Sequence, residues 1–190
     1  MAEPLIGAAL VPDAGAAAVE DEFFRSAEFF GAEGVTHTLV VCDDGPDPAT
    51  VALPLIVREI PDSGGLMDAT SPYSYPGARV SGRTLDPSEI DFSGSGLVSI
   101  FVRDRLGEPR AFAGGTERSL VQVSDPELPR KSRMSDRQQI RKNEAAGYAI
   151  GSTPGPETGP AARQGFQTVY TETMRAVDAG DRYFFGLDYF

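Results

Sequence analysis

Hydrophobic and polar positions alternate along two neighbouring stretches of the chain, and this alternation predicts a β-hairpin. The first stretch, near residues 35–41, reads VTHTLVV, and the second, near residues 50–58, reads TVALPLIVR, with the turn signal GPDP between them. Pro54 lies inside the second stretch and favours an edge or bulged position, because proline cannot donate a ladder hydrogen bond. We expect further strands near residues 97–103, 119–123 and 148–151.

Apolar residues recur at helical spacing in other parts of the chain. They predict helices near residues 20–31, 134–146 and 161–179. In the middle one, Ser135 and Gln138 have the spacing of a capping box, and Gly147 is a typical stop signal. The mixture of strands and helices predicts an α+β fold, in which a mixed, twisted sheet is flanked by these helices.

The Gly and Pro content changes along the chain and suggests where the ordered part begins. Residues 1–18 are rich in Ala, Gly and Pro, so we expect a loose lead-in there and a domain over residues 19–180. Between the hairpin and residue 83, the chain is dense in Gly, Pro, Ser and Tyr, which predicts an ordered loop around a short strand.

The charge of the chain limits its partners. It carries 17 Lys and Arg against 28 Asp and Glu, a formal net charge of -11, and this field repels nucleic acids and anionic membranes. No apolar run approaches the ~20 residues of a membrane span, and the N-terminus has no secretory pattern. A single cysteine, Cys42, fits a reducing compartment, so we expect a cytoplasmic protein that binds no DNA.

Positive charge nevertheless gathers in one short segment. Residues 130–142 hold six of the 17 cations, and Arg133, Arg137 and Arg141 recur every four residues. On a helix these three arginines form one stripe, where like charges repel by a few tenths of a kcal/mol per pair. Three interpretations stay open: a solvated face, pairing with acids of the same chain, or binding of an external anion.

The stretch DATSPYSYPG, residues 68–77, is a second candidate site. Asp68, Ser71, Tyr73 and Tyr75 crowd a loop that is punctuated by prolines and glycine. Tyrosines on such loops often face ligands, because the ring offers contact area at a small entropic cost. The alternative is a loop that is packed for structural reasons.

Other familiar chemistries have no pattern in this sequence. The lone His37 lies between two threonines in a strand-like run and cannot support a Ser–His–Asp triad. The sequence shows no Cys/His metal spacing and no phosphate-loop motif, so we expect no metal and can name no catalytic residue.

Three segments in this order resemble the FemABX-like group of the GNAT acyltransferase superfamily. They are DATSPYSYPG, SRMSDRQQIRKNEAAGYAI and FQTVYTETMRAVDAGDRYFFGLDYF, and the likeness covers roughly residues 35 to 190. The resemblance implies a protein of two GNAT-like halves, each a mixed, twisted sheet flanked by helices. It also implies an acyl donor on the second half, and an acceptor cleft that draws on the first half.

The resemblance also implies an activity. The leading interpretation is an acyltransferase or aminoacyltransferase that acts on an amine acceptor in a cell-wall, polysaccharide or natural-product pathway. The complete enzyme would use acyl-CoA or aminoacyl-tRNA as co-substrate and no tightly bound cofactor. The residues expected to bind the small-molecule or cell-wall-precursor acceptor are Asp68, Ser71, Tyr73, Tyr75, Arg133, Arg137 and Arg141.

The printed sequence ends where the second half of this family should begin. We therefore expect residues 181–190 to start a missing half, so that the 190-residue chain alone is inactive and a separate second half is a partner. The aromatic end, YFFGLDYF, is expected to cause self-association. The alternative function is a non-catalytic module, a degenerate or truncated half that binds a ligand or a partner.

Overall fold

The computed structural model describes the chain except residues 1–4, 108, 119, 122–126 and 129–131. The chain divides into two compact units, one mainly of residues 1–116 and the other mainly of residues 117–188. Each unit is described by itself below.

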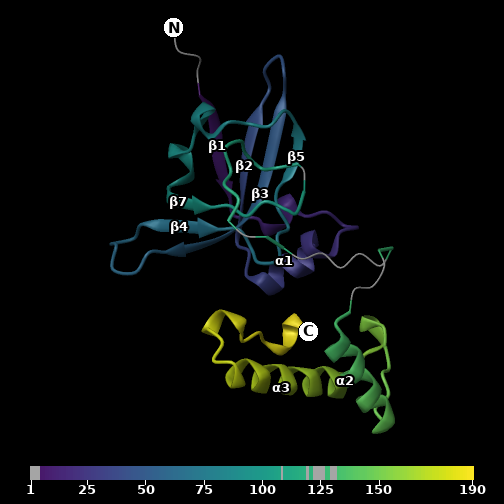
Figure 1. Ribbon diagram of the computed structural model, residues 1–190. Helices are drawn as coiled ribbons and strands as arrows, with labels where there is room; N and C mark the ends of the chain where they lie inside the picture. The colour runs from purple at the N-terminus through teal and green to yellow at the C-terminus, as the bar shows by residue number, and fades with distance from the viewer. Residues whose placement is uncertain (1–4, 108, 119, 122–126, 129–131) are drawn as a thin grey trace. The chain divides into compact units, whose positions relative to one another are not determined.

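The first unit is built on one curled, mixed sheet of seven strands (Figure 1). The neighbours along the sheet are β6, β1, β2, β3, β4 and β7, and β5 pairs with β3 beside this path. Each neighbouring pair from β1 to β4 is antiparallel, whereas β7 is parallel to β4 and β6 is parallel to β1. The strands are β1 Ile6–Val11, β2 His37–Asp43, β3 Ala49–Glu59, β4 Met67–Thr70, β5 Arg79–Gly82, β6 Ile90–Asp91 and β7 Leu97–Phe101.

The core of the sheet comes from the hairpin of β2 and β3. Leu39 lies opposite Leu53 and Val41 lies opposite Val51, and all four side chains are buried. Such apolar cross-strand pairs are the main stabilising unit of an antiparallel sheet. Burial of a leucine or valine contributes ~1.5–3 kcal/mol, so these pairs explain why the hairpin forms the centre of the unit.

Strand β3 changes its neighbour on the side away from β2. Its first part, Ala49–Ala52, pairs with β5, and its last part, Ile56–Glu59, pairs with β4. Between them, no described strand pairs with Leu53–Leu55 on that side, and the buried Pro54 occupies the middle of the gap. The chain between β4 and β5 therefore spans a fork in the sheet, and in Figure 1 β4 and β7 run across the direction of β2 and β3.

A short helical segment packs against the sheet. The 3-10 turns η1 (Ala14–Ala17) and η2 (Phe23–Arg25) precede α1 (Ala27–Glu33). Ser26 caps α1 by accepting a hydrogen bond from the Phe29 backbone. Phe29 and Phe30 are buried in a cluster with Ala17, Val35 and Ala52. The helix predicted near 20–31 is thus split, because Ser26 starts a new helix.

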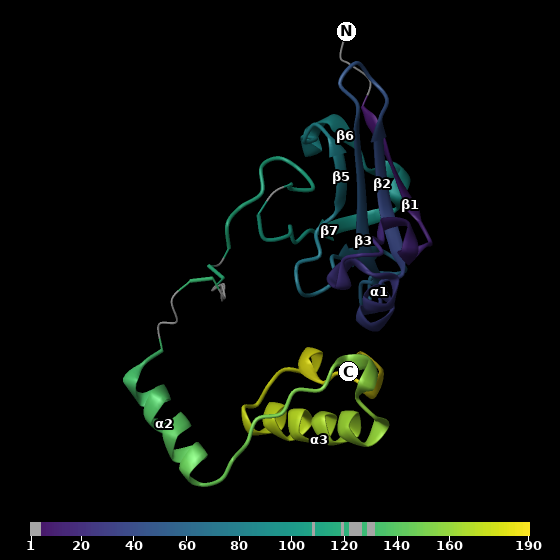
Figure 2. The same cartoon turned by 90° about the vertical axis from the view of Figure 1, so that its right-hand side faces the viewer.

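The second unit contains two helices, α2 (Met134–Ala145) and α3 (Pro160–Ala176) (Figure 2). The Tyr170 hydroxyl donates to the Tyr183 carbonyl at 2.8 Å, and the rings of Phe166 and Phe190 lie 5.0 Å apart. These contacts fold the aromatic C-terminal segment onto α3. Among the described residues from 117 to 190, none is buried. The remaining short elements of the chain are the 3-10 turns η3 Pro87–Glu89, η4 Ser93–Ser95, η5 Gly155–Glu157, η6 Asp181–Tyr183 and η7 Leu187–Tyr189.

The α+β class and most predicted elements are confirmed. The strands predicted near 35–41, 50–58 and 97–103 form β2, β3 and β7, and the two later helices form α2 and α3. That α2 and α3 cover the sheet, and that the sheet is GNAT-like with one half of a two-half architecture, stay predictions. So do the domain limit at residue 180 and the role of residues 181–190.

Two predictions for the strands are wrong. Residues 6–11, expected within a loose lead-in, form β1, because they pair with β2 along the edge of the hairpin. Residues 148–151 form no strand, and Tyr148 and Ile150 are exposed, because no described strand lies beside them to share backbone hydrogen bonds. The strand predicted near 119–123 falls largely outside the described residues.

Candidate functional site

Asp68 lies on β4 directly opposite Arg58 on β3. The Arg58 guanidinium donates to the two carboxylate oxygens of Asp68, with Nε–Oδ1 at 2.7 Å and Nη2–Oδ2 at 3.4 Å. This pairing raises the pKa of Arg58. Because Asp68 is engaged by its cross-strand neighbour, its geometry is that of a surface ion pair, and its predicted role in substrate binding stays a prediction.

Ser71 is buried at the point where β4 ends, beside the end of β7. Its backbone N–H donates to the Phe101 carbonyl at 2.9 Å, and its hydroxyl accepts the backbone N–H of Arg103 at 2.8 Å. The hydroxyl also donates to the Phe101 carbonyl at 3.2 Å. Ser71 therefore joins the ends of the two parallel strands, which is a positioning role for the loop that follows.

The tyrosine loop, residues 71–78, connects β4 to β5. Ser71 and Pro72 are buried at its start, and Pro76, Gly77 and Ala78 are buried at its end. Between them, Tyr73 is 48% exposed and Tyr75 is 37% exposed. Neither ring is buried, and neither lines the cavity described below, so the predicted cleft at Tyr73 and Tyr75 stays a prediction.

The backbone of the tyrosine loop is strained at its tip. Ser74 has φ 68° and Tyr75 has φ 56°, in the left-handed region that side chains with a Cβ rarely adopt. Each such residue costs on the order of 1–3 kcal/mol and persists only where its surroundings determine it. Gly77 has φ 66°, and a Cβ there would lie 2.9 Å from the Arg105 backbone nitrogen, so the loop must carry glycine at this position.

The arginine stripe lies on α2, in the second unit. Arg137 and Arg141 are exposed on the helix, and Arg133 is its N-cap. The predicted Ser135 capping box is wrong, because the helix begins at Met134 and the Arg133 N–H donates to the Asp136 carboxylate at 3.3 Å. The Gly147 stop is confirmed by its φ of 81° and its hydrogen bond to the Glu144 carbonyl.

In the described part of the chain, no carboxylate forms an ion pair with Arg133, Arg137 or Arg141. Of the three interpretations of the stripe, this geometry fits a solvated face or a site for an external anion. The seven predicted site residues thus fall into two sets: four on or beside the tyrosine loop, and three on α2. The two sets belong to different units, so their predicted shared site stays a prediction.

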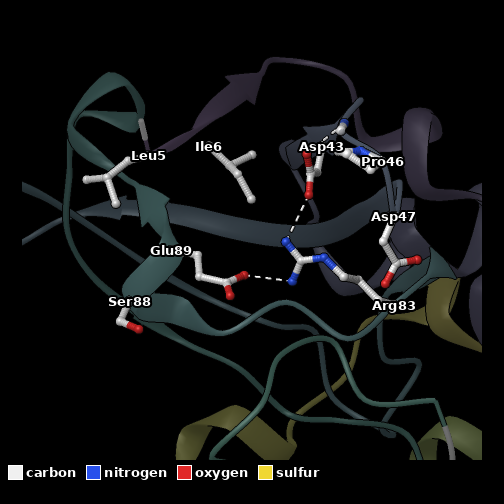
Figure 3. Close-up of a pocket in the computed structure, with 9 residues that line it drawn as sticks. Leu5, Ile6, Asp43, Pro46, Asp47, Arg83, Ser88 and Glu89 are labelled. Carbon is white, nitrogen blue, oxygen red and sulfur yellow. Dashed lines mark hydrogen bonds and ion pairs between the residues drawn. The ribbon is translucent and has the colours of Figure 1, made fainter. Parts of the chain in front are cut away.

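The first unit also has an open cavity of about 580 Å³, which sequence reasoning missed (Figure 3). It lies at the end of the β2–β3 hairpin, between the start of β1 and the segment after β5. Arg83 occupies its centre, with Asp43 on one side and Glu89 on the other (Figure 3). Its lining residues are Leu5, Ile6, Asp43, Gly45, Pro46, Asp47, Arg83, Ser88 and Glu89.

Arg83 is held by two carboxylates in this cavity. Its Nη2 lies 2.8 Å from Asp43 Oδ2, and its Nη1 lies 2.7 Å from Glu89 Oε2. The hydrogen bonds to Glu89 and Asp43 raise the pKa of Arg83. Hydrogen bonds from the Gly45 backbone and from Arg83 lower the pKa of Asp43. Both groups therefore stay charged at neutral pH, and the pair connects the hairpin to the segment after β5.

Three carboxylates and one guanidinium line the cavity, so its field favours cations over anions. Arg83 does not supply an anion site, because two of its nitrogens already donate to internal acids. Within the described residues, no group of three or more His, Cys, Asp or Glu side chains is placed to hold a metal ion. The sequence signal for this cavity was the acidic run from Asp43 to Asp47, which by itself indicates only a turn.

Comparison with known proteins adds no relative. A scan against protein-family models finds no match, and searches of curated proteins and of solved structures find none either. Of the helices in the described ranges, none has the length and apolar character to cross a membrane.

Proposed function

We propose that this chain supplies the acceptor-binding side of an acyltransferase or aminoacyltransferase of the FemABX-like, GNAT type. The acceptor is an amine of a cell-wall, polysaccharide or natural-product pathway in the cytoplasm. The observation that carries the proposal is the tyrosine loop, which is fixed at both ends and presents Tyr73 and Tyr75 beside the parallel strands β4 and β7. The mixed sheet agrees with the fold expected of this superfamily.

The chemistry of such a transfer needs no metal. The acceptor amine attacks the carbonyl carbon of a thioester or an ester, the new C–N bond forms, and the C–S or C–O bond to the donor breaks. The amine proton leaves to solvent or to a base. The protein accelerates this step by orienting the two reactants and by stabilising the oxyanion. In this proposal, acyl-CoA or aminoacyl-tRNA is held by a second GNAT-like half, and the chain described here orients the amine.

One observation favours a second candidate, a non-catalytic module that binds a ligand or partner. In the described part of the chain, hydrogen bonds lower the pKa values of Asp43, Asp86 and Asp91 and raise those of Arg58 and Arg83. Each of these shifts moves a pKa away from neutrality. An acid–base catalyst requires a pKa near the working pH, so none of these five groups is tuned for proton transfer.

Ligand binding tests the acceptor site. We expect a nucleotide-sugar or a lysine-containing peptide to raise the melting temperature of the chain and to perturb NMR signals of residues 71–78. The double variant Tyr73→Ala/Tyr75→Ala should lose this effect. Tyr148→Ala is the matched control, because Tyr148 is exposed but lies on the other unit. Equal binding by wild type and the double variant would contradict the proposed site.

Turnover separates the two candidate functions. Acyl-CoA and the bound amine are mixed with the chain, with and without a second GNAT-like half, and the released thiol is measured. Thiol release that requires both the amine and Tyr73 and Tyr75 supports the transferase. Binding without thiol release in either mixture supports the non-catalytic module.

A further inference from the structure

The tyrosine loop is held at its first residues by Arg103. The guanidinium Nη1 of Arg103 donates to the Ser71 carbonyl at 2.8 Å and lies 3.2 Å from the Thr70 hydroxyl. The backbone N–H of the same residue donates to the Ser71 hydroxyl. Its guanidinium carbon lies 4.8 Å from the centre of the Phe101 ring, so the side chain is fixed by stacking as well.

The other end of the loop is held by Arg25. This side chain is buried, and its Nη2 donates to the Ala78 carbonyl at 3.3 Å. Its Nη1 lies 3.0 Å from Glu22 Oε1, and the second oxygen of Glu22 lies 3.6 Å from Nη2 of Arg105. Arg25 therefore brings a buried, charge-balanced group against the loop backbone.

Between the two arginines, Glu33 at the end of α1 accepts the backbone N–H of Tyr73 at 3.0 Å. Three charged side chains, those of Arg103, Arg25 and Glu33, thus contact the loop through its backbone. Contacts of this kind fix the path of the chain without covering the side chains. They explain how Ser74 and Tyr75 keep positive φ angles, since such angles persist only where the surrounding structure determines them.

We propose that Arg103 and Arg25 are positioning residues, which hold the strained tyrosine loop so that Tyr73 and Tyr75 meet the acceptor. This inference rests on the proposed function of the loop. Arg103 contributes more than Arg25 to holding the loop, because its planar guanidinium contacts two acceptors and one ring at once. The single ammonium of lysine cannot reproduce these contacts. A lysine at this position keeps the charge and loses the geometry.

If the role of Arg103 were merely structural, its substitution would change the melting temperature and nothing specific at the loop. A positioning role changes the order of the loop tip while the sheet stays folded. The chain has no tryptophan. Tyr75→Trp therefore places a single fluorescent reporter at the loop tip, and all further variants are made in this background.

We expect Arg103→Ala to raise the acrylamide quenching constant of the reporter about twofold and to lower its anisotropy. Arg103→Lys should behave like Arg103→Ala, and Arg25→Lys should produce a smaller change in the same direction. Arg58→Ala is the matched control, because Arg58 is a neighbouring arginine whose side-chain hydrogen bonds go to Asp68. Far-UV circular dichroism at the same temperature shows that each variant is folded.

The inference is overturned if the quenching constant and anisotropy of the reporter in folded Arg103→Lys equal those of the Tyr75→Trp background. It is also overturned if Arg58→Ala changes them as much as Arg103→Lys does. Should Arg103→Ala fail to fold, the lysine variants decide the result alone. Binding of the nucleotide-sugar and of the lysine peptide is measured on the same arginine variants made in wild type, where Tyr75 is intact. If the quenching of the reporter changes but wild type binds neither probe, the proposed function is contradicted, while the role of the arginines in holding the loop stands. If the reporter shows a more mobile loop but the arginine variants bind the probes as wild type does, the positioning role is overturned.

Discussion

The two regions of the molecule differ in both charge and burial. Residues 1–116 hold seven Lys and Arg against 18 Asp and Glu, so this region carries the whole net charge of -11. Residues 117–190 hold ten of each, and their described part has no buried residue. The acidic region has a core of paired strands, whereas the neutral region consists of helices defined by local signals.

This difference indicates where the stability of the chain lies. The pairs Leu39–Leu53 and Val41–Val51 are buried and belong to different strands, so they form and break together with the sheet. The helices α2 and α3 contain no buried residue, and short helices that bury little surface are marginal in water. We therefore expect mutations to act on stability mainly through the first region.

The largest expected effect is that of a cavity in the sheet. Leu53→Ala removes a side chain with no exposed surface and should cost about 2–5 kcal/mol of unfolding free energy. Val169→Ala on α3, where the side chain is 63% exposed, should cost less than about 0.5 kcal/mol. Urea unfolding followed by circular dichroism measures both. Equal losses would show that the second region shares the cooperative core.

Glycine substitutions give the next comparison. Gly82 has φ 80°, and a Cβ there would overlap the Pro48 carbonyl oxygen, so Gly82→Ala should cost roughly 2–4 kcal/mol. Gly147 has φ 81°, but no neighbouring atom lies within 4 Å of the position that a Cβ would occupy. Gly147→Ala should therefore shorten α2 at its C-terminal end and cost roughly 1–2 kcal/mol of local helix stability. It should leave the urea midpoint of the sheet unchanged. A shift of that midpoint would contradict the separation of the two regions.

Acid should act on the first region in a defined direction. Folding lowers the pKa of Asp43 below its ordinary value of 3.8, so the ionised Asp43 stabilises the folded state fully above pH 3.8. This contribution is lost as the pH falls through the lower, folded pKa. We expect the urea midpoint of wild type to decrease once the pH is below about 4. The urea midpoint of Asp43→Asn should be lower than that of wild type at neutral pH and should depend less on pH. Glu172→Gln on α3 is the control and should follow wild type.

The smallest expected effect concerns the arginine stripe. Arg137 and Arg141 repel each other at one helical turn, so Arg137→Ala should stabilise α2 by about 0.2–0.5 kcal/mol. The Cα chemical shifts of residues 134–145 at low and high salt measure this. Salt should increase the helicity of wild type more than that of the variant, because it screens the repulsion. A decrease of wild-type helicity with salt would show that the stripe pairs with acids.

The sequence predicted the elements whose signals are local. Strands β2 and β3 follow from alternation, and α2 and α3 follow from helical spacing. Strand β1 was missed because IGAALV has a weak pattern and is a strand only through its pairing with β2. A short apolar run near residue 150 has a strand-like pattern as well, yet no partner strand supports it. Local pattern and non-local pairing are thus separate requirements.

The candidate sites show the same limit. The tyrosine loop was predicted from its crowded Tyr, Pro and Gly, but its arginine anchors come from residues 25 and 103, which no spacing connects. The cavity around Arg83 combines three separate stretches of the chain, near residues 5, 45 and 86. Only the register of the sheet brings these stretches together, so no reading of one stretch could have found the cavity.

Pro54 at the fork of β3 also bears on aggregation. Proline has no backbone N–H, so β3 presents one donor fewer between the parts that pair with β5 and β4. A continuous edge of 11 residues would be a template on which another chain could add as a strand. The fork replaces it with two stretches of four residues that are both paired within the chain, and this arrangement protects the longest strand of the protein from edge-to-edge association.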